Sequence, residues 1–173
     1  MIKKALGRVA LVGLTMCGIS TSTVMAQDSL FRSVIIGSNP KTIIAGVQSG
    51  GAPWTVERGS AVLNDDGKLH VTLRDLILPN LGNPGPVTSV SASLVCGGAG
   101  GTVVATTDPV PLSGDGNADI DAKISVPGPC FAPTVLVRAA GFNGNVLPQP
   151  GPWIAASGTT VPNGSQDKDG DGK

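Results

Sequence analysis

The chain has 173 residues, of which 14% are charged and 3% aromatic, and its twelve basic side chains balance its twelve acidic ones. Charges dispersed in this way lack the clustered Lys and Arg that nucleic acid or an anionic membrane surface would require. We therefore expect neither a nucleic-acid partner nor insertion into a membrane.

The first 26 residues have the pattern of a secretory signal peptide. Lys3, Lys4 and Arg8 precede a mostly apolar stretch over residues 9–19, and the small residue Ala26 comes before Gln27. Signal peptidase reads such small residues, so we expect cleavage near Ala26–Gln27 and a secreted or periplasmic protein. The apolar stretch is shorter than the roughly 20 residues that a membrane helix needs. Cleavage would remove three of the twelve basic residues and no acidic one, which leaves about 147 residues with a net charge near −3, a length that suits one domain.

Residues 27–40 form a leader for which the sequence predicts no definite structure, and the folded domain is expected over residues 41–157. In the segment KLHVTLRDL, apolar Leu69, Val71 and Leu73 alternate with polar side chains, which is the pattern of a strand with one face in water. The preceding Asp66-Gly67 tolerates the positive φ of a tight turn. A hairpin is therefore predicted over about 54–78.

Later segments have the same two-residue period. In VTSVSASLVC, the alternate residues Val90, Ala92, Leu94 and Cys96 are expected to face the core, whereas the opposite, polar face is expected to carry Ser89, Ser91 and Ser93. ADIDAKISV alternates in the same way. TVVATTD, PTVLVRAAGF, WIAAS and KTIIAGV have strand composition, although their inward faces are not defined.

Clusters of Pro and Gly separate these segments, and no capped amphipathic helix is predicted after the signal peptide. About seven or eight short strands of this kind favour an all-β fold, namely an antiparallel immunoglobulin-like sandwich. A small β-barrel is the alternative. Trp54 and Trp153 each follow a proline, and we expect each to begin a strand and bury its indole. Alternatively, the two indoles could form an exposed platform on which a sugar stacks.

Two cysteines remain after signal cleavage, Cys96 and Cys130. An even cysteine count in an exported chain indicates a disulfide bond. A zinc site would need further Cys or His ligands nearby, and the chain has one histidine. We therefore predict a Cys96–Cys130 disulfide that joins two neighbouring strand ends.

Residues 158–173 form a polar tail with too little apolar content to order itself. Asp167, Asp169, Asp171 and Gly172 match the first half of a calcium-binding EF-hand loop, but the sequence ends at Lys173, before the bidentate Glu of such a loop. We expect at most weak calcium binding by the three aspartates, and no other metal or cofactor.

The sequence assigns no catalytic or cofactor-binding residue. His70 falls on the outward face of the predicted hairpin, which is the position of a surface histidine, whereas a Ser-His-Asp hydrolase would need it in a cleft. Glu57 is the only Glu, and paired-carboxylate chemistry would require it to lie near an Asp in space.

The stretch DGNADID places four polar residues at alternate positions, as calcium ligands are placed in a loop. Ile120, however, stands where the loop requires Gly. A turn followed by a strand with two outward-facing carboxylates is the preferred interpretation of Asp115, Asn117, Asp119 and Asp121.

Residues 54–157 contain a Cys-Gly-Gly, an Ala-Thr-Thr-Asp-Pro run and a Pro-Cys-x-x-Pro-Thr-Val segment, found in SASLVCGG, VVATTDPV and PCFAPTVLV. In these segments the chain resembles a group of uncharacterised secreted bacterial proteins. The resemblance implies an exported single-domain protein and no particular activity.

The sequence favours an exported, non-catalytic β-sandwich with a structural or binding role and a partner in the extracellular space or the cell envelope. A secreted hydrolase that uses Asp and Glu carboxylates is one alternative. A calcium-dependent adhesion or matrix module is the other. Sandwich folds host many unrelated roles, so architecture alone does not choose among these hypotheses.

Overall fold

The structure is a computed structural model that describes residues 29–158 of the chain, and they form almost entirely antiparallel β-structure. A single 3₁₀ turn, η1, spans Gly98–Gly100. The strands are β1 (Ser29–Gly37), β2 (Ile43–Ile44), β3 (Val47–Gln48), β4 (Arg58–Asn64), β5 (Lys68–Arg74), β6 (Val87–Cys96), β7 (Thr102–Thr106), β8 (Val110–Pro111), β9 (Ala118–Lys123), β10 (Thr134–Phe142), β11 (Asn145–Val146) and β12 (Trp153–Ser157). The all-β prediction is confirmed.

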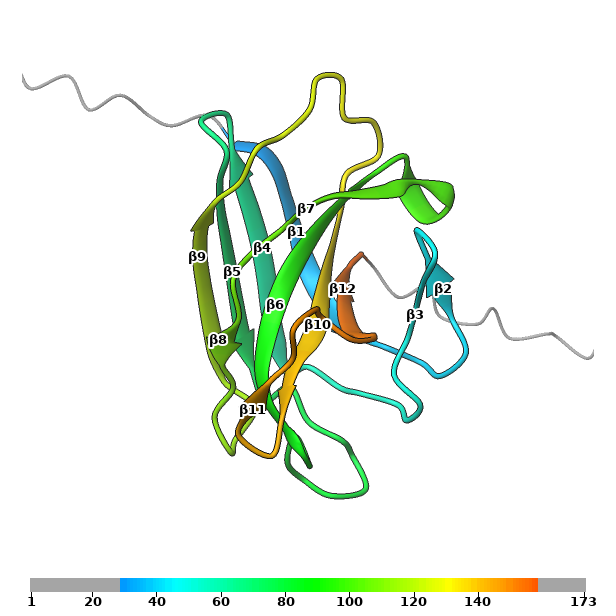
Figure 1. Cartoon of the computed structure of the whole chain (residues 1–173), viewed down its shortest axis with the longest axis vertical. Coiled ribbons are helices and arrows are strands. Elements are labelled where there is room, and N and C mark those ends of the chain that lie inside the picture. The colour runs from blue at the N-terminus through cyan, green and yellow to red at the C-terminus, as the bar shows by residue number, and fades with distance from the viewer. Residues whose placement is uncertain (1–28, 159–173) are drawn as a thin grey trace, which may run out of the picture.

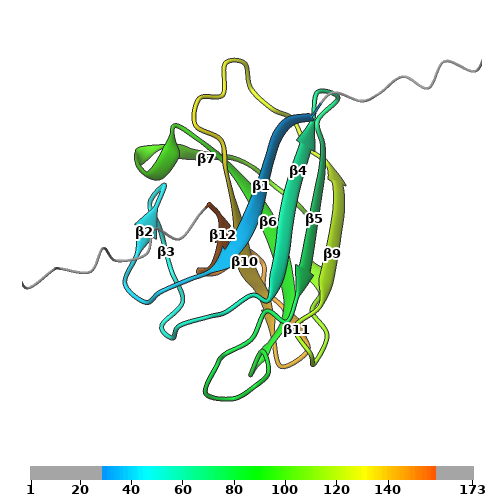
Figure 2. The same ribbon diagram turned by 180° about the vertical axis from the view of Figure 1, so that it is seen from behind.

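Eight strands form one continuous path in the order β7-β6-β10-β12-β1-β4-β5-β9. Strand β1 belongs to both halves of this path, because residues 29–34 pair with β4 and residues 35–37 pair with β12. Figures 1 and 2 show β4, β5 and β9 in one layer that faces β6 and β10 in the other. The two facing layers are a feature of the sandwich that the sequence predicted. The continuous pairing through β1 is a feature of the barrel that was its alternative.

Strand β1 corrects the expectation that residues 27–40 are a leader outside the folded domain. Ile35 is buried in the core, while Val34 beside it is exposed, so the strand has the usual alternation. At Gly37 a Cβ atom would lie 1.9 Å from the carbonyl oxygen of Trp54. The close crossing of β1 and the Trp54 backbone therefore requires glycine at this position.

The predicted hairpin is confirmed. Strands β4 and β5 pair in antiparallel register, and an isolated bridge between Thr55 and Ile77 extends the hairpin close to the limits that the sequence predicted. Gly67 has a φ of 81° in the connecting turn. The side chains predicted to face inward on β5 are fully buried: Leu69, Val71 and Leu73.

The main core lies between the two layers. Its buried side chains come from β4, β5 and β9 on one side and from β6, β10 and β12 on the other, and they include Leu63, Leu73, Leu94, Ile120, Val137 and Ile154. A second, smaller cluster lies on the outer face of the β6–β10–β12 layer. It consists of Val95, Leu136, Trp153 and Ala156, packed against Ile44, Ala45, Val47 and Val103.

This second cluster corrects the expected polar face of β6. Ser91 and Ser93 have no exposed surface, and Ser89 is 7% exposed, although the sequence placed all three on a wet face. The segment KTIIAGV contributes to the cover of this face, because it forms the β2–β3 hairpin instead of one long strand. This hairpin stands beside β12 on the outer side of the layer (Figure 1), where its Ile44 and Val47 pack against the second cluster.

Both tryptophans are buried as predicted, Trp54 at 6% exposure and Trp153 at 5%. Trp153 begins β12, but Trp54 lies just before the isolated bridge at Thr55 and not within a strand. The alternative of an exposed stacking platform made by the two indoles is therefore wrong.

Candidate functional site

The outward face of β5 and β9 carries several of the ionisable groups that the sequence analysis considered. His70 Nδ1 lies 2.7 Å from Asp121 Oδ1, and Thr72 Oγ1 lies 3.1 Å from His70 Nε2. The side chain of His70 is 45% exposed, so this residue lies on the surface as predicted.

The order carboxylate, imidazole, hydroxyl is that of a Ser-His-Asp triad with threonine in place of serine. Acyl transfer at such a triad also needs N–H donors aimed at the developing oxyanion. Strand β5 pairs with β4 on one side and with β9 on the other. The N–H groups that flank Thr72 therefore point along the sheet toward neighbouring strands, and not above the face where a substrate would lie. We interpret the three side chains as a row of surface hydrogen bonds, in which His70–Asp121 joins β5 to β9 and His70–Thr72 runs along β5.

A second cross-strand pair lies beside this row. Arg74 Nη2 donates to both carboxylate oxygens of Asp119, each at 3.0 Å. Asp119 and Asp121 thus face outward from β9, and Gly116 before them has the positive φ of a turn, 77°. The interpretation of DGNADID as a turn and a strand is confirmed.

The remaining carboxylates considered as catalytic or metal-binding groups are spread over the surface. Glu57 is exposed before β4, Asp65 and Asp66 lie in the β4–β5 turn, and Asp115 lies in the turn before β9. Within residues 29–158, no group of three or more His, Cys, Asp or Glu side chains lies close enough together to hold a metal ion. Asp167, Asp169 and Asp171 lie outside the described residues, so weak calcium binding by them stays a prediction.

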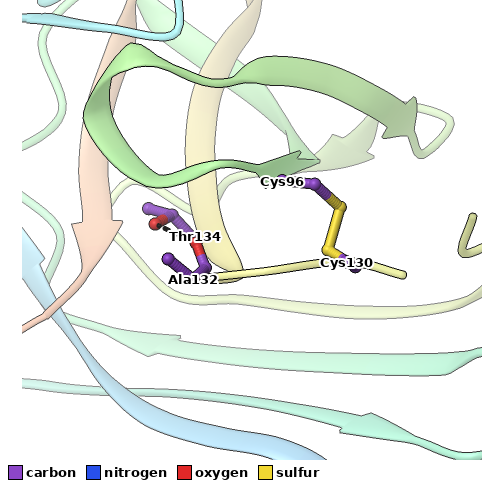
Figure 3. Close-up of a disulfide and its surroundings, with 4 residues drawn as sticks. All are labelled: Cys96, Cys130, Ala132 and Thr134. Carbon is purple, nitrogen blue, oxygen red and sulfur yellow. Dashed lines mark hydrogen bonds between the residues drawn. A yellow bond between two sulfur atoms is a disulfide. The ribbon is translucent and has the colours of Figure 1, made fainter. Parts of the chain in front are cut away.

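The predicted disulfide is present in the structure. Cys96 ends β6 and Cys130 lies in the loop that leads to β10, with their Cα atoms 5.1 Å apart (Figure 3). Beside it, the Gly97 N–H donates to the Phe131 carbonyl at 2.7 Å, and the Gly98 N–H donates to the Ala132 carbonyl at 3.2 Å. Because β6 and β10 pair along their length, the disulfide joins two neighbouring strand ends, as the sequence predicted.

An apolar hollow of about 370 Å³ lies next to the disulfide, and we call it the disulfide-end hollow. It is lined mainly by apolar groups from β1, from the end of β4 and from the loop before β10: Leu30, Phe31, Leu63, Val126, Pro127, Gly128, Cys130 and Pro133, with Asp65 as the one ionisable side chain. Leu30 is 60% exposed, and Phe131, which follows Cys130 in the chain, is 71% exposed. Leu30 is thus an exposed apolar side chain in the lining of an apolar depression, and Phe131 is a second exposed apolar side chain one residue from the disulfide.

A second, more polar hollow lies on the outer face of the β6–β10–β12 layer, and we call it the Arg138 hollow. Its lining residues are Gly46, Val47, Gln48, Ser49, Arg138, Gly151 and Pro152. The sequence analysis did not single out Arg138. The sequence feature that could have identified it is a single charged residue within the apolar strand segment TVLVRAAG. A charged side chain on a covered strand face requires a partner.

Among the described residues, no helix has the length and the apolar content to cross a membrane. A scan against models of protein families, a search of curated proteins and a search of solved structures each returned no match to this chain. The resemblance of residues 54–157 to secreted bacterial proteins stays a prediction.

The disulfide generates a stability prediction. The two cysteines are 34 residues apart, and the double variant Cys96→Ser/Cys130→Ser should lower the free energy of unfolding by about 4 kcal/mol, because the unfolded chain regains the freedom of a closed loop. Urea unfolding of the mature protein measures this change. Asp119→Asn is the control and should cost less than about 1 kcal/mol, because its ion pair is half exposed. A loss below about 1 kcal/mol for the cysteine variant would contradict the prediction.

Proposed function

We propose that the protein is an exported β-domain with a non-catalytic role, and that it binds a protein partner in the extracellular space or the cell envelope. The N-terminal pattern of a signal peptide and the Cys96–Cys130 disulfide support the location, since such bonds persist in oxidising compartments. The disulfide alone is a weak indication, and the signal pattern adds an independent one.

The observation that carries the binding role is the disulfide-end hollow. Single exposed apolar residues are common on protein surfaces, but a contiguous apolar patch marks an interaction site. Here the exposed Leu30 lines an apolar depression, and the exposed Phe131 lies next to Cys130, which lines it too. The depression suits an aliphatic or aromatic side chain of a partner protein.

The chemistry of the same hollow favours binding over hydrolysis. Acid–base hydrolysis of the glycosidase type needs two carboxyl groups about 5 to 10 Å apart, and the lining of the hollow carries only Asp65. The outward-facing Asp119 and Asp121 are each held by a basic partner on an open face. The secreted-hydrolase hypothesis thus has less support than the binding role.

Export can be tested by cell fractionation. The mature chain should begin at or near Gln27 and appear outside the cytoplasm of the producing cell, with no titratable thiol until a reductant is added. N-terminal sequencing and a thiol assay on the native fraction measure both properties. Recovery of the intact chain with reduced cysteines from the cytoplasm would refute the location.

The binding surface can be tested by site-specific cross-linking. A photoreactive phenylalanine analogue at position 131 should capture one defined protein from the producer's own envelope or medium, because Phe131 is exposed and follows Cys130, which lines the disulfide-end hollow. The matched control is a chain in which the same analogue replaces Val146, and it should not capture this protein. Val146 is 63% exposed and lies in β11, at the opposite end of the molecule (Figure 1).

The captured band should disappear when Leu30→Ser, which changes the lining of the hollow, is added to the chain that carries the analogue. Equal capture from positions 131 and 146, or capture that survives Leu30→Ser, would show that this hollow is not the binding surface. Far-UV circular dichroism of each variant checks that the β-structure is retained.

A further inference from the structure

Arg138 lies on the covered outer face of the β6–β10–β12 layer. Its direct neighbours in the sheet are Ser91 on β6 and Trp153 on β12, and residues that pair across antiparallel strands share one face. Trp153 belongs to the second hydrophobic cluster, and its Nε1 donates to the Val47 carbonyl at 3.1 Å. The guanidinium therefore lies beside a packed apolar cluster.

Two backbone carbonyls hold one edge of the guanidinium. Arg138 Nε donates to the Gly151 carbonyl at 2.8 Å, and Nη2 donates to the Pro150 carbonyl. Both carbonyls belong to the Pro-rich loop between β11 and β12, which folds back over the strand. This arrangement fixes the orientation of the side chain without neutralising its charge.

The other edge of the guanidinium is available. A guanidinium carries five N–H donors, one on Nε and two on each terminal nitrogen. Only two of the five have a hydrogen-bond partner among residues 29–158. One N–H on Nη1 and one on Nη2 form the fork that matches the two oxygens of a carboxylate.

Within residues 29–158, the charge of Arg138 also has no carboxylate beside it in the hollow. Arg74 and His70 each contact a carboxylate of β9, whereas the lining of the Arg138 hollow includes no Asp or Glu. Burial lowers the pKa of Arg138, because it removes water from the charged group. A partly buried cation without a counter-charge is unfavourable, so an anion at this position would be stabilised.

The surroundings of Arg138 have room for such an anion. The Arg138 hollow has a volume of about 520 Å³ and includes no second basic residue in its lining. A single positive charge balances one negative charge, which favours a carboxylate over a phosphate dianion.

We propose that the Arg138 hollow is a binding site for a monocarboxylate, which the free Nη1 and Nη2 donors of Arg138 hold in a bidentate manner. The site lies on the outer face of the β6–β10–β12 layer, and the proposal is independent of the partner surface at the disulfide-end hollow. The carboxylate could come from a peptide C-terminus or from an acidic sugar, since both present the same planar group.

Calorimetric titration of the mature protein tests the proposal with matched ligand pairs. N-acetylalanine is compared with N-acetylalaninamide, and glucuronate is compared with glucose, so that each pair differs at the carboxylate. At least one acid should bind at least about tenfold more tightly than its neutral counterpart, and the acid that binds more tightly indicates the source. No measurable preference for either acid would overturn the proposal.

Variants then test the role of Arg138. Arg138→Gln should weaken binding of the preferred acid by about tenfold or more, and Arg138→Lys should also weaken it, because lysine keeps the charge but lacks the fork. Arg74→Gln, which removes an arginine already paired with Asp119, should leave the affinity unchanged. An affinity within about twofold of the original for Arg138→Gln would overturn the proposal. The comparison of acid with neutral ligand on the unmodified protein stays decisive even if Arg138→Gln fails to fold.

Discussion

The whole structure depends on the burial of the β6–β10–β12 layer on both faces. On the inner face, Leu94 and Val137 pack against the opposite layer, and on the outer face Leu136 and Trp153 pack under the β2–β3 hairpin. Each fully buried side chain of this size stabilises the fold by about 1.5–3 kcal/mol, so both faces contribute substantially. The outer face of this layer also carries the buried serines of β6 and the partly buried Arg138. The polar features of the outer face are consequences of this packing.

The two layers are connected at one side by β1, which pairs with β4 and then with β12, and the Cys96–Cys130 disulfide ties the loop from β9 to β10 to the end of β6. These two connections also shape the disulfide-end hollow. The first residues of β1 form one wall, and the loop that the disulfide ties to the end of β6 forms another. A binding surface built from a strand and a cross-linked loop is preorganised, so a partner loses little conformational entropy of the protein when it binds.

The sequence predicted the elements whose alternation is complete and whose turns have clear chemistry. Strand β5 and the Gly67 turn are examples, and the cysteine count was sufficient for the disulfide. The sequence did not predict β1, because its polar and apolar residues do not alternate cleanly over residues 29–37. It also misplaced Ser91 and Ser93, because serine tolerates either side of a strand and the alternation of β6 carries no information about a distant hairpin that covers it. Arg138 was missed for the same reason, since its significance depends on the loop and the hairpin that enclose it.

Amide hydrogen exchange on the mature protein tests the double burial most directly, because protection follows local stability within the native state. We expect the slowest-exchanging amides in the centres of β6 and β10. Strand β9 lies at the end of the strand path and should exchange faster, although its inward side chains Ala118 and Ile120 are buried. Exchange in β10 as fast as in β9 would mean that the outer face is open to water, which would contradict the burial of this layer on both faces.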